Sequence, residues 1–385
     1  MRIRNITLYE EDGRAVLTAK CDEFDLFYKF PQSIKPRIRA DAFVAACLIP
    51  AMANGNDIEL DTDVEYSPRL LKNLDKLQDI FCQWSKYFNK KLQKVRIQGG
   101  IAKELDQGLD QCISFFSGGV DGSYTLFKNF EEIDLLFFAK GIDMQLNNDE
   151  LFSQALERNR LYLESKNKEL VEVETNVRFL GYETANVGWK LCFGGGLASI
   201  ALAANAKKCF IASGVAYGTL YPEGSNFVTD QLWSSDFTEI VHDGAEASRI
   251  EKLARILQDP GLAEVLRVCW QDKEYNCGKC EKCLRTMIAI RALQMSVPTF
   301  PELTDSQVKN EVKRIRLYTQ IDYDFLMENL EQAEQSGDVL LVRALNRLKR
   351  SYELKELARE IDKTLFSGLL VKWLTRKHVN AEIRD

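Results

Sequence analysis

The chain has 385 residues, of which 51 are basic and 57 acidic, so its formal net charge is −6, and 45% of its residues are hydrophobic. This composition is typical of a folded globular protein and excludes an intrinsically disordered chain. No run approaches the roughly 18 apolar residues of a membrane span, and the first residues lack the apolar core of a signal peptide. We therefore expect a cytoplasmic protein that stays out of membranes and has no broad attraction for nucleic acid.

Residues 1–105 predict a small N-terminal α+β domain. Alternating apolar residues on both sides of Asp12-Gly13 indicate a β-hairpin. The apolar run 40–52 indicates a buried helix, and Ser67 followed by Pro68 is typical of a second helix start. This segment shows no catalytic constellation.

Residues 106–300 alternate strand and helix patterns, which predicts an α/β domain with a parallel sheet covered on both faces. The expected strands are 112–116, 135–139, 170–174, 209–213 and 239–242. The expected helices are 123–129, 150–166, 189–206 and 246–257. Ligands of such sheets bind at the carboxyl ends of the strands, so functional residues are expected there.

A glycine-rich stretch follows the first expected strand and predicts an anion-binding loop. Its residues are Ser117, Gly118, Gly119, Val120, Asp121, Gly122 and Ser123. Glycines let successive N–H groups converge on one anion, and the following helix presents its positive end. The two serines add hydroxyl donors, whereas Asp121 can position Mg²⁺ or cap the helix. An ordinary structural turn is the alternative.

This stretch resembles the signature Ser-Gly-Gly-x-Asp-Ser of the PP-loop ATP pyrophosphatases, with Gly122 at the place of the last serine. The resemblance implies that residues 117–123 bind the pyrophosphate end of ATP with Mg²⁺, and that Ser117, Asp121 and Ser123 serve catalysis. It also implies that Gly141 and Asp143, after the second strand, lie near the adenine and ribose. Asp143 as an ordinary loop carboxylate is the alternative.

Four further residues near strand ends are candidate substrate contacts. Arg178 can bind a phosphate or carboxylate, or can be a plain surface arginine. The long loop 214–236 offers Asp230 and an exposed Trp233 for a planar base, unless the tryptophan only anchors the loop. His242 is either a proton carrier or a structural histidine. The triple glycine 194–196 favours tight packing of its helix against the sheet over a second anion site.

Cys269, Cys277, Cys280 and Cys283 have the spacing C-x7-C-x2-C-x2-C, which predicts a closed structural Zn²⁺ site. An iron–sulfur cluster, also held by four thiolates, is the alternative. The glycine loop followed by this cysteine pattern resembles the 7-cyano-7-deazaguanine synthase family over about residues 112–290. That resemblance implies ATP-dependent activation of a deazapurine-like carboxylate and acyl transfer to ammonia or an amine. Relatives in bacterial antiviral defence make a protein acceptor a further option.

Residues 301–385 predict a helical C-terminal extension, with a capping box at Thr304 and helical apolar runs 341–348 and 354–361 that we expect to pack. The predicted partners are ATP and a small-molecule carboxylate, with a homo-oligomer left open. The alternative to an enzyme is a zinc-stapled nucleotide-binding module that has lost turnover through Gly122.

Overall fold

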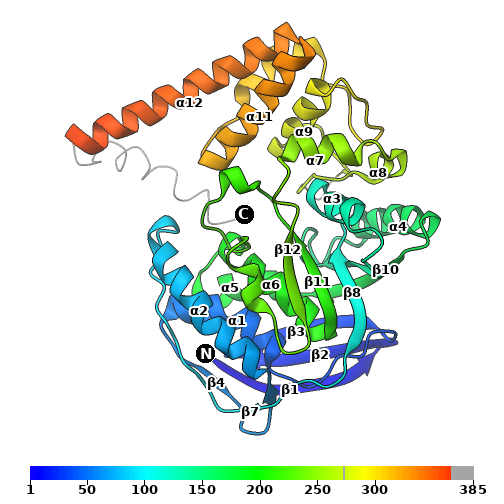
Figure 1. The fold of residues 1–385 in the computed structure, drawn as a ribbon, viewed down its shortest axis with the longest axis vertical. Helices are drawn as coiled ribbons and strands as arrows, with labels where there is room; N and C mark the ends of the chain where they lie inside the picture. Colours follow the sequence, from blue (N-terminus) through cyan, green and yellow to red (C-terminus); the bar gives the residue numbers. More distant parts are fainter. Residues whose placement is uncertain (272–273, 366–385) are drawn as a thin grey trace.

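The computed structural model describes residues 1–271 and 274–365, and its ribbon is shown in Figure 1. The fold is α/β and contains a ten-stranded sheet of order β12-β11-β8-β9-β10-β3-β2-β1-β4-β6. The strands of this sheet are β1 (Arg2–Glu11), β2 (Arg14–Cys21), β3 (Phe24–Pro31), β4 (Ile58–Leu60), β6 (Ile97–Gln98), β8 (Leu109–Phe115), β9 (Leu135–Lys140), β10 (Glu169–Thr175), β11 (Ala206–Ala212) and β12 (Glu239–Asp243). Two short strands, β5 (Glu65–Tyr66) and β7 (Ile101–Ala102), pair with each other outside it.

The five strands β8 to β12 are mutually parallel, as the alternating sequence pattern predicted. The N-terminal strands continue this sheet, because β3 pairs antiparallel with β10 through Tyr28 opposite Thr175. Arg14 on β2 adds an ion pair with Glu172 on β10 at 2.9 Å. The predicted boundary near residue 105 therefore separates two stretches of sequence that share one sheet.

Helices cover both faces of the sheet, and two apolar cores lie between the layers. Successive residues of β9 point to opposite faces, so that Phe137 belongs to one core and Phe138 to the other. The first core is covered by α1 (Asp41–Asn54), α2 (Pro68–Trp84), α5 (Val177–Ala185) and α6 (Trp189–Ala204). The second is covered by α3 (Val120–Lys128), α4 (Asp149–Ser165), α7 (Arg249–Ile256), α8 (Pro260–Val265), α9 (Glu281–Ala292), α10 (Asp305–Asn310), α11 (Gln320–Ser336) and α12 (Val339–Leu365).

The three glycines of α6 permit close packing, but the closest approaches of Gly194 and Gly195 are to the loop 214–236 and α1, whereas the sequence predicted packing against the sheet. A Cβ on Gly194 would stand 2.0 Å from the carbonyl oxygen of Gly224, and one on Gly195 would stand 2.7 Å from that of Ala45 on α1. These approaches place α1, α6 and the loop 214–236 in direct contact. The N-terminal helix α1 is therefore part of the helical layer that covers one face of the central sheet.

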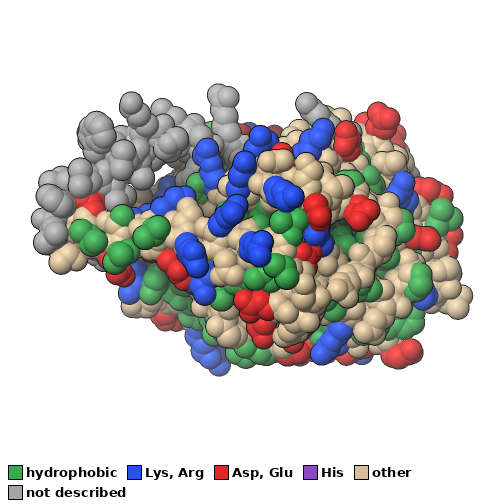
Figure 2. All heavy atoms as spheres, turned by 90° about the horizontal axis from the view of Figure 1, so that it is seen from above, with side chains coloured by type: hydrophobic (Ala, Val, Ile, Leu, Met, Phe, Trp, Pro, Cys, Tyr) green, Lys and Arg blue, Asp and Glu red, His purple; other side chains and the backbone are tan. Residues whose placement is uncertain are grey.

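The C-terminal helices lie above the carboxyl ends of the parallel strands, and the last part of α12 projects from the body (Figure 1). Leu341, Leu345 and Leu348 pack into the second core as predicted. The prediction was wrong for Leu354 and Leu357, which are 66% and 54% exposed on the projecting part. Seen from above, lysine and arginine side chains gather over this end of the molecule (Figure 2). Residues 366–385, also predicted helical, lie outside the described residues.

Within the described part of the chain, the structure contains no helix with the combined length and apolar character that crossing a membrane requires.

Candidate nucleotide and metal sites

The glycine loop joins the end of β8 to the start of α3, at the carboxyl edge of the parallel strands. Gly118 has a φ of +77°, a conformation that glycine adopts without strain. A Cβ there would stand 2.3 Å from the carbonyl oxygen of Val265, so a side chain cannot be accommodated. Gly119 precedes α3 as its N-cap and offers no side-chain cap, which leaves the first amides of the helix open to another acceptor. The hydroxyl of Ser123 is buried without a hydrogen-bond partner.

Asp121 in the first turn of α3 is held by two cations of α7. Its Oδ2 accepts a hydrogen bond from Arg249 at 2.6 Å, and its Oδ1 lies 3.5 Å from the Nζ of Lys252. Burial alone raises the pKa of Asp121, but the positive charges of Arg249 and Lys252 outweigh it and lower the pKa below the ordinary value. Lys252 is 1% exposed and donates to the carbonyl oxygen of Ser213 at the end of β11. The loop therefore faces charged side chains that the sequence patterns did not single out.

The turn after β9 is shaped by Gly141, which has a φ of +92°. A Cβ on Gly141 would stand 1.9 Å from the carbonyl oxygen of Thr175, so this glycine permits the turn to lie against the end of β10. Arg178 on α5 donates to the carbonyl oxygen of Ile142 and ties α5 to the same turn. Asp143 in this turn is exposed.

Lys282, at the start of α9, is exposed, and its ammonium lies 5.1 Å from the centre of the Trp270 ring. Loss of hydration in the crowded surroundings lowers the pKa of Lys282, although part of its side chain reaches solvent. The charged groups that act on its ammonium are Asp143, Arg249, Asp121 and Arg178. The structure thus brings the predicted residues Asp121, Asp143 and Arg178 into electrostatic range of one lysine.

Asp230 and His242 form a buried pair beside the end of β12. The Nδ1 of His242 lies 2.7 Å from Oδ2 of Asp230, and both side chains are almost fully buried. Asp230 also accepts hydrogen bonds from the hydroxyl of Ser225 at 2.6 Å and from the backbone N–H of Asn226 at 3.1 Å. These contacts hold the carboxylate within the loop 214–236, while the Nε2 of His242 is buried without a partner.

Trp233 differs from the expectation of an exposed stacking surface, because it is 0% exposed. Its indole packs against Gly195 on α6, where a Cβ would stand 2.9 Å from the ring. Apolar burial of this large ring fixes the loop 214–236 against α6. Trp233 is therefore an anchor in this conformation and has no free face for a base.

Glu223, in the same loop, is a titratable group that the sequence patterns did not indicate. Burial raises the pKa of its carboxyl to about 7; the positive charge of Lys190 opposes this shift, and the negative charges of Asp230 and Asp121 add to it. A carboxyl group with such a pKa exchanges protons at neutral pH.

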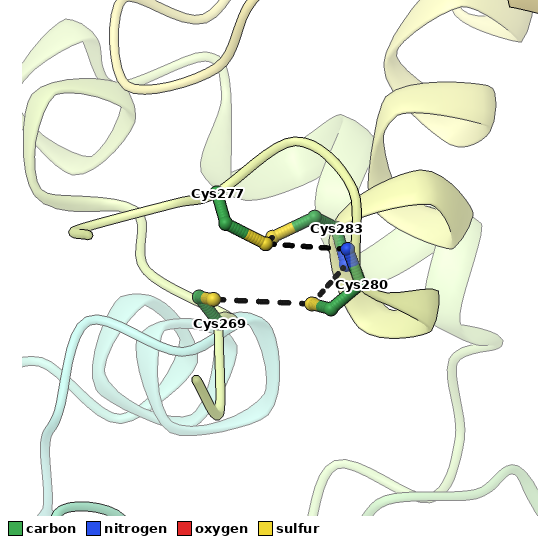
Figure 3. Close-up of side chains that lie close together, drawn as sticks. All are labelled: Cys269, Cys277, Cys280 and Cys283. Carbon is green, nitrogen blue, oxygen red and sulfur yellow. Dashed lines mark hydrogen bonds between the residues drawn. The ribbon is translucent and has the colours of Figure 1, made fainter. Parts of the chain in front are cut away.

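The four predicted cysteines converge although Cys269 is separated from the other three in sequence (Figure 3). Their sulfur atoms all lie within 4.8 Å of one another. The distance from Cys269 to Cys280 is 3.8 Å and that from Cys277 to Cys283 is 3.9 Å. Four sulfurs at about 2.3 Å from one tetrahedral ion are about 3.8 Å apart, so the cluster is compatible with a Zn²⁺ site.

Backbone amides support this arrangement of sulfur atoms. The N–H of Cys280 donates to the sulfur of Cys277 at 3.2 Å, and the N–H of Cys283 donates to that of Cys280 at 3.4 Å. Hydrogen bonds lower the pKa of Cys280 and favour its thiolate, and the largest contribution comes from the side chain of Cys283. Gly278, with a φ of +65°, makes the turn between the second and third cysteine. A tetrahedral ion held by all four sulfur atoms would have no position open for a substrate, which is typical of a structural metal.

Comparisons of the chain with models of protein families, with curated proteins and with solved structures gave no match.

Proposed function

We propose that this protein binds ATP with Mg²⁺ at the glycine loop and transfers the AMP group to a carboxylate. The observation that carries the proposal is the loop itself. It combines a left-handed Gly118, uncapped helix amides and the unpartnered hydroxyl of Ser123 at the carboxyl edge of a parallel sheet. Such a site holds a phosphate chain.

In the proposed reaction a carboxylate oxygen attacks the α-phosphorus, and the bond from that phosphorus to the leaving pyrophosphate breaks. Lys252 and Arg249 supply positive charge beside the loop, and Lys282 adds a third cation from α9. These groups stabilise the charge that develops on the leaving phosphates. Asp121 fits a role as Mg²⁺ ligand because its Oδ1 has no hydrogen-bond partner. Mg²⁺, when bound, would neutralise phosphate charge.

The acyl group then passes to ammonia or an amine, whose nitrogen attacks the acyl carbon as AMP leaves. The amine must lose a proton in this step, and Glu223 is suited to accept it because its pKa is about 7. A deazapurine-like substrate follows from the resemblance described above, and the zinc site serves to hold the segment around Lys282 in place.

The proposal is tested with α-labelled ATP, Mg²⁺, a deazapurine carboxylate and ammonia, and labelled AMP is separated by chromatography. We expect AMP that depends on the carboxylate and is lost in Asp121→Asn. The matched control is Asp110→Asn, which removes a carboxylate of an exposed ion pair with Lys207. Wild-type protein that forms no AMP with small molecules or with candidate protein acceptors would contradict the adenylating function.

A nucleotide-binding module without turnover is the second candidate. It is favoured by one observation, that Arg249 and Lys252 already compensate the charge of Asp121 without a metal ion. This candidate predicts that ATP binds, as measured by calorimetry, while no AMP appears under any of the conditions above.

A further inference from the structure

Arg267 is a buried arginine for which the described structure provides no counter-charge. It is 4% exposed, and its Nε and one terminal nitrogen have no hydrogen-bond partner. Arginine is always protonated in proteins, and an unpaired buried guanidinium is strongly destabilising. For a buried group of this kind we expect a ligand that supplies the missing hydrogen-bond acceptors.

The position of Arg267 connects it with the glycine loop. Its backbone N–H donates to the carbonyl oxygen of Gly118 at 2.9 Å, and its own carbonyl oxygen lies 3.8 Å from where a Cβ on Gly119 would stand. Arg267 therefore belongs to the wall against which the loop is folded.

Asn159 on α4 stands at the same place and is also without partners. It is 0% exposed, and neither polar atom of its amide forms a hydrogen bond. Its Oδ1 lies 3.2 Å from the position of a Cβ on Gly118. The amide of Asn159 thus lies beside Gly118, and the backbone of Arg267 binds the same glycine. Both side chains are buried with unused donors, and this is independent of the helix end that follows the loop.

Arg158 is a second arginine in this region. Arg267 and Arg158 are the charged groups that act on the hydroxyl of Tyr275, which donates to the carbonyl oxygen of Val265. Arg158 lies 4.4 Å from the centre of the Tyr275 ring. Neither arginine forms an ion pair within the described residues, so an anion would find no competing carboxylate partner on them.

We infer that Arg267 and Asn159 form an inner phosphate subsite behind the glycine loop, which binds oxygens of the ATP pyrophosphate group. This inference rests on the proposed function. The guanidinium supplies two N–H donors to a phosphate, and the amide of Asn159 supplies a third. The glycine at 118 is needed here because a side chain would fill the space beside Asn159.

The test compares Arg267→Met with the wild type in two measurements, affinity for ATP or inorganic pyrophosphate by calorimetry, and thermal unfolding without ligand. We expect affinity for both ligands to fall roughly 10- to 100-fold, since charge-assisted hydrogen bonds are lost. We expect the Tm without ligand to stay the same or rise, because methionine fills the space without a buried charge. A purely structural arginine would give the opposite result, a lower Tm with unchanged affinity.

Arg158→Met is the matched control, because it removes one positive charge from the same region while Arg158 is exposed. We expect less than about a threefold effect on affinity from the loss of an exposed charge. Asn159→Leu provides a second variant that should weaken pyrophosphate binding without changing the net charge. Pyrophosphate binding to Arg267→Met with wild-type affinity would overturn the subsite, whereas wild-type protein that binds neither ligand would overturn the proposed function as well.

Discussion

Gly122 marks the closest approach between α3 and the strand that precedes it. A Cβ on Gly122 would stand 2.8 Å from the carbonyl oxygen of Phe115, the last residue of β8. That distance is shorter than ordinary van der Waals contact, so any side chain would push the helix away from the strand. Glycine at this position therefore allows α3 to lie this close to the end of β8.

We predict that Gly122→Ser, which would complete the PP-loop signature, lowers the free energy of unfolding by about 1–3 kcal/mol through this clash. It should also weaken nucleotide binding, because the loop amides move with the helix. Denaturant unfolding and calorimetry measure the two effects. Gly214→Ser is the control, since a Cβ there has no neighbour within 4 Å. A variant with wild-type stability and newly gained turnover would contradict this prediction.

At the scale of single residues, the sequence identified the groups that local patterns encode. The glycines of the loop and the four cysteines stand at short, regular spacings, and the structure places them as a strand-to-helix turn and a sulfur cluster. Arg249 and Lys252 were missed because their role depends on α7 crossing the start of α3, which is a tertiary contact. The burial of Trp233 was missed for the same reason, because its partner on α6 is distant in sequence.

At the scale of elements, the segment from Cys269 to the start of α9 depends on its cysteines. Cys280 is the N-cap of α9, and its side chain accepts a hydrogen bond from the N–H of Cys283. Asn276 fixes the other end by accepting from the N–H groups of Val268 and Cys269. The described residues of this segment, 269–271 and 274–280, form no helix or strand, and a metal ion held by the cysteines would stabilise them.

We predict that the purified protein contains one zinc ion per chain, measured by elemental analysis. Removing it with a chelator, or by Cys283→Ser, should cost on the order of 3 kcal/mol, a fall of about 4 °C in Tm for a chain of this length. Cys82→Ser is the control, because Cys82 lies on α2 outside the cluster. Visible absorbance from iron and sulfide in place of zinc would instead establish the iron–sulfur alternative.

Helices and strands were predicted correctly where apolar residues recur with a clear period. All five central strands and the helices α3, α4, α6 and α7 were expected close to their observed bounds, since each carries a clear apolar pattern. The helix α5, which has nine residues and contains Gly181, was not expected from the sequence. The pairing of β3 with β10 was also missed, because no local pattern indicates which strand a distant hairpin joins.

At the scale of the whole molecule, the N-terminal segment and the central sheet form one structural unit. One apolar core extends from Met1, which precedes β1, to Ile240 on β12. The hydroxyl of Tyr28 on β3 donates to Ser199 on α6 at 2.8 Å in a fully buried position. Contacts of this kind couple the folding of both parts.

We predict that Tyr28→Phe lowers the free energy of unfolding by about 1 kcal/mol, because one buried hydrogen bond is lost. Circular dichroism and tryptophan fluorescence should report the same shifted transition. Tyr9→Phe, at a position that is 47% exposed, is the control and should have no measurable effect. Two separate transitions, of which only one responds to Tyr28→Phe, would show that residues 1–105 fold independently.

The junction between β3 and β10 also has a consequence for synthesis on the ribosome. Phe27 on β3 donates to Asn176 at the end of β10, a residue 149 positions later. At translation speeds of about 5–20 residues per second, the nascent hairpin waits roughly 10 to 30 s for that partner. During this time its open strand edge is exposed to other chains, and the charged side chains of Asp25 and Lys29 on β3 provide protection against premature pairing. Yield in the cell should therefore be sensitive to chaperone supply and translation rate to a degree that the stability of the finished protein does not reveal.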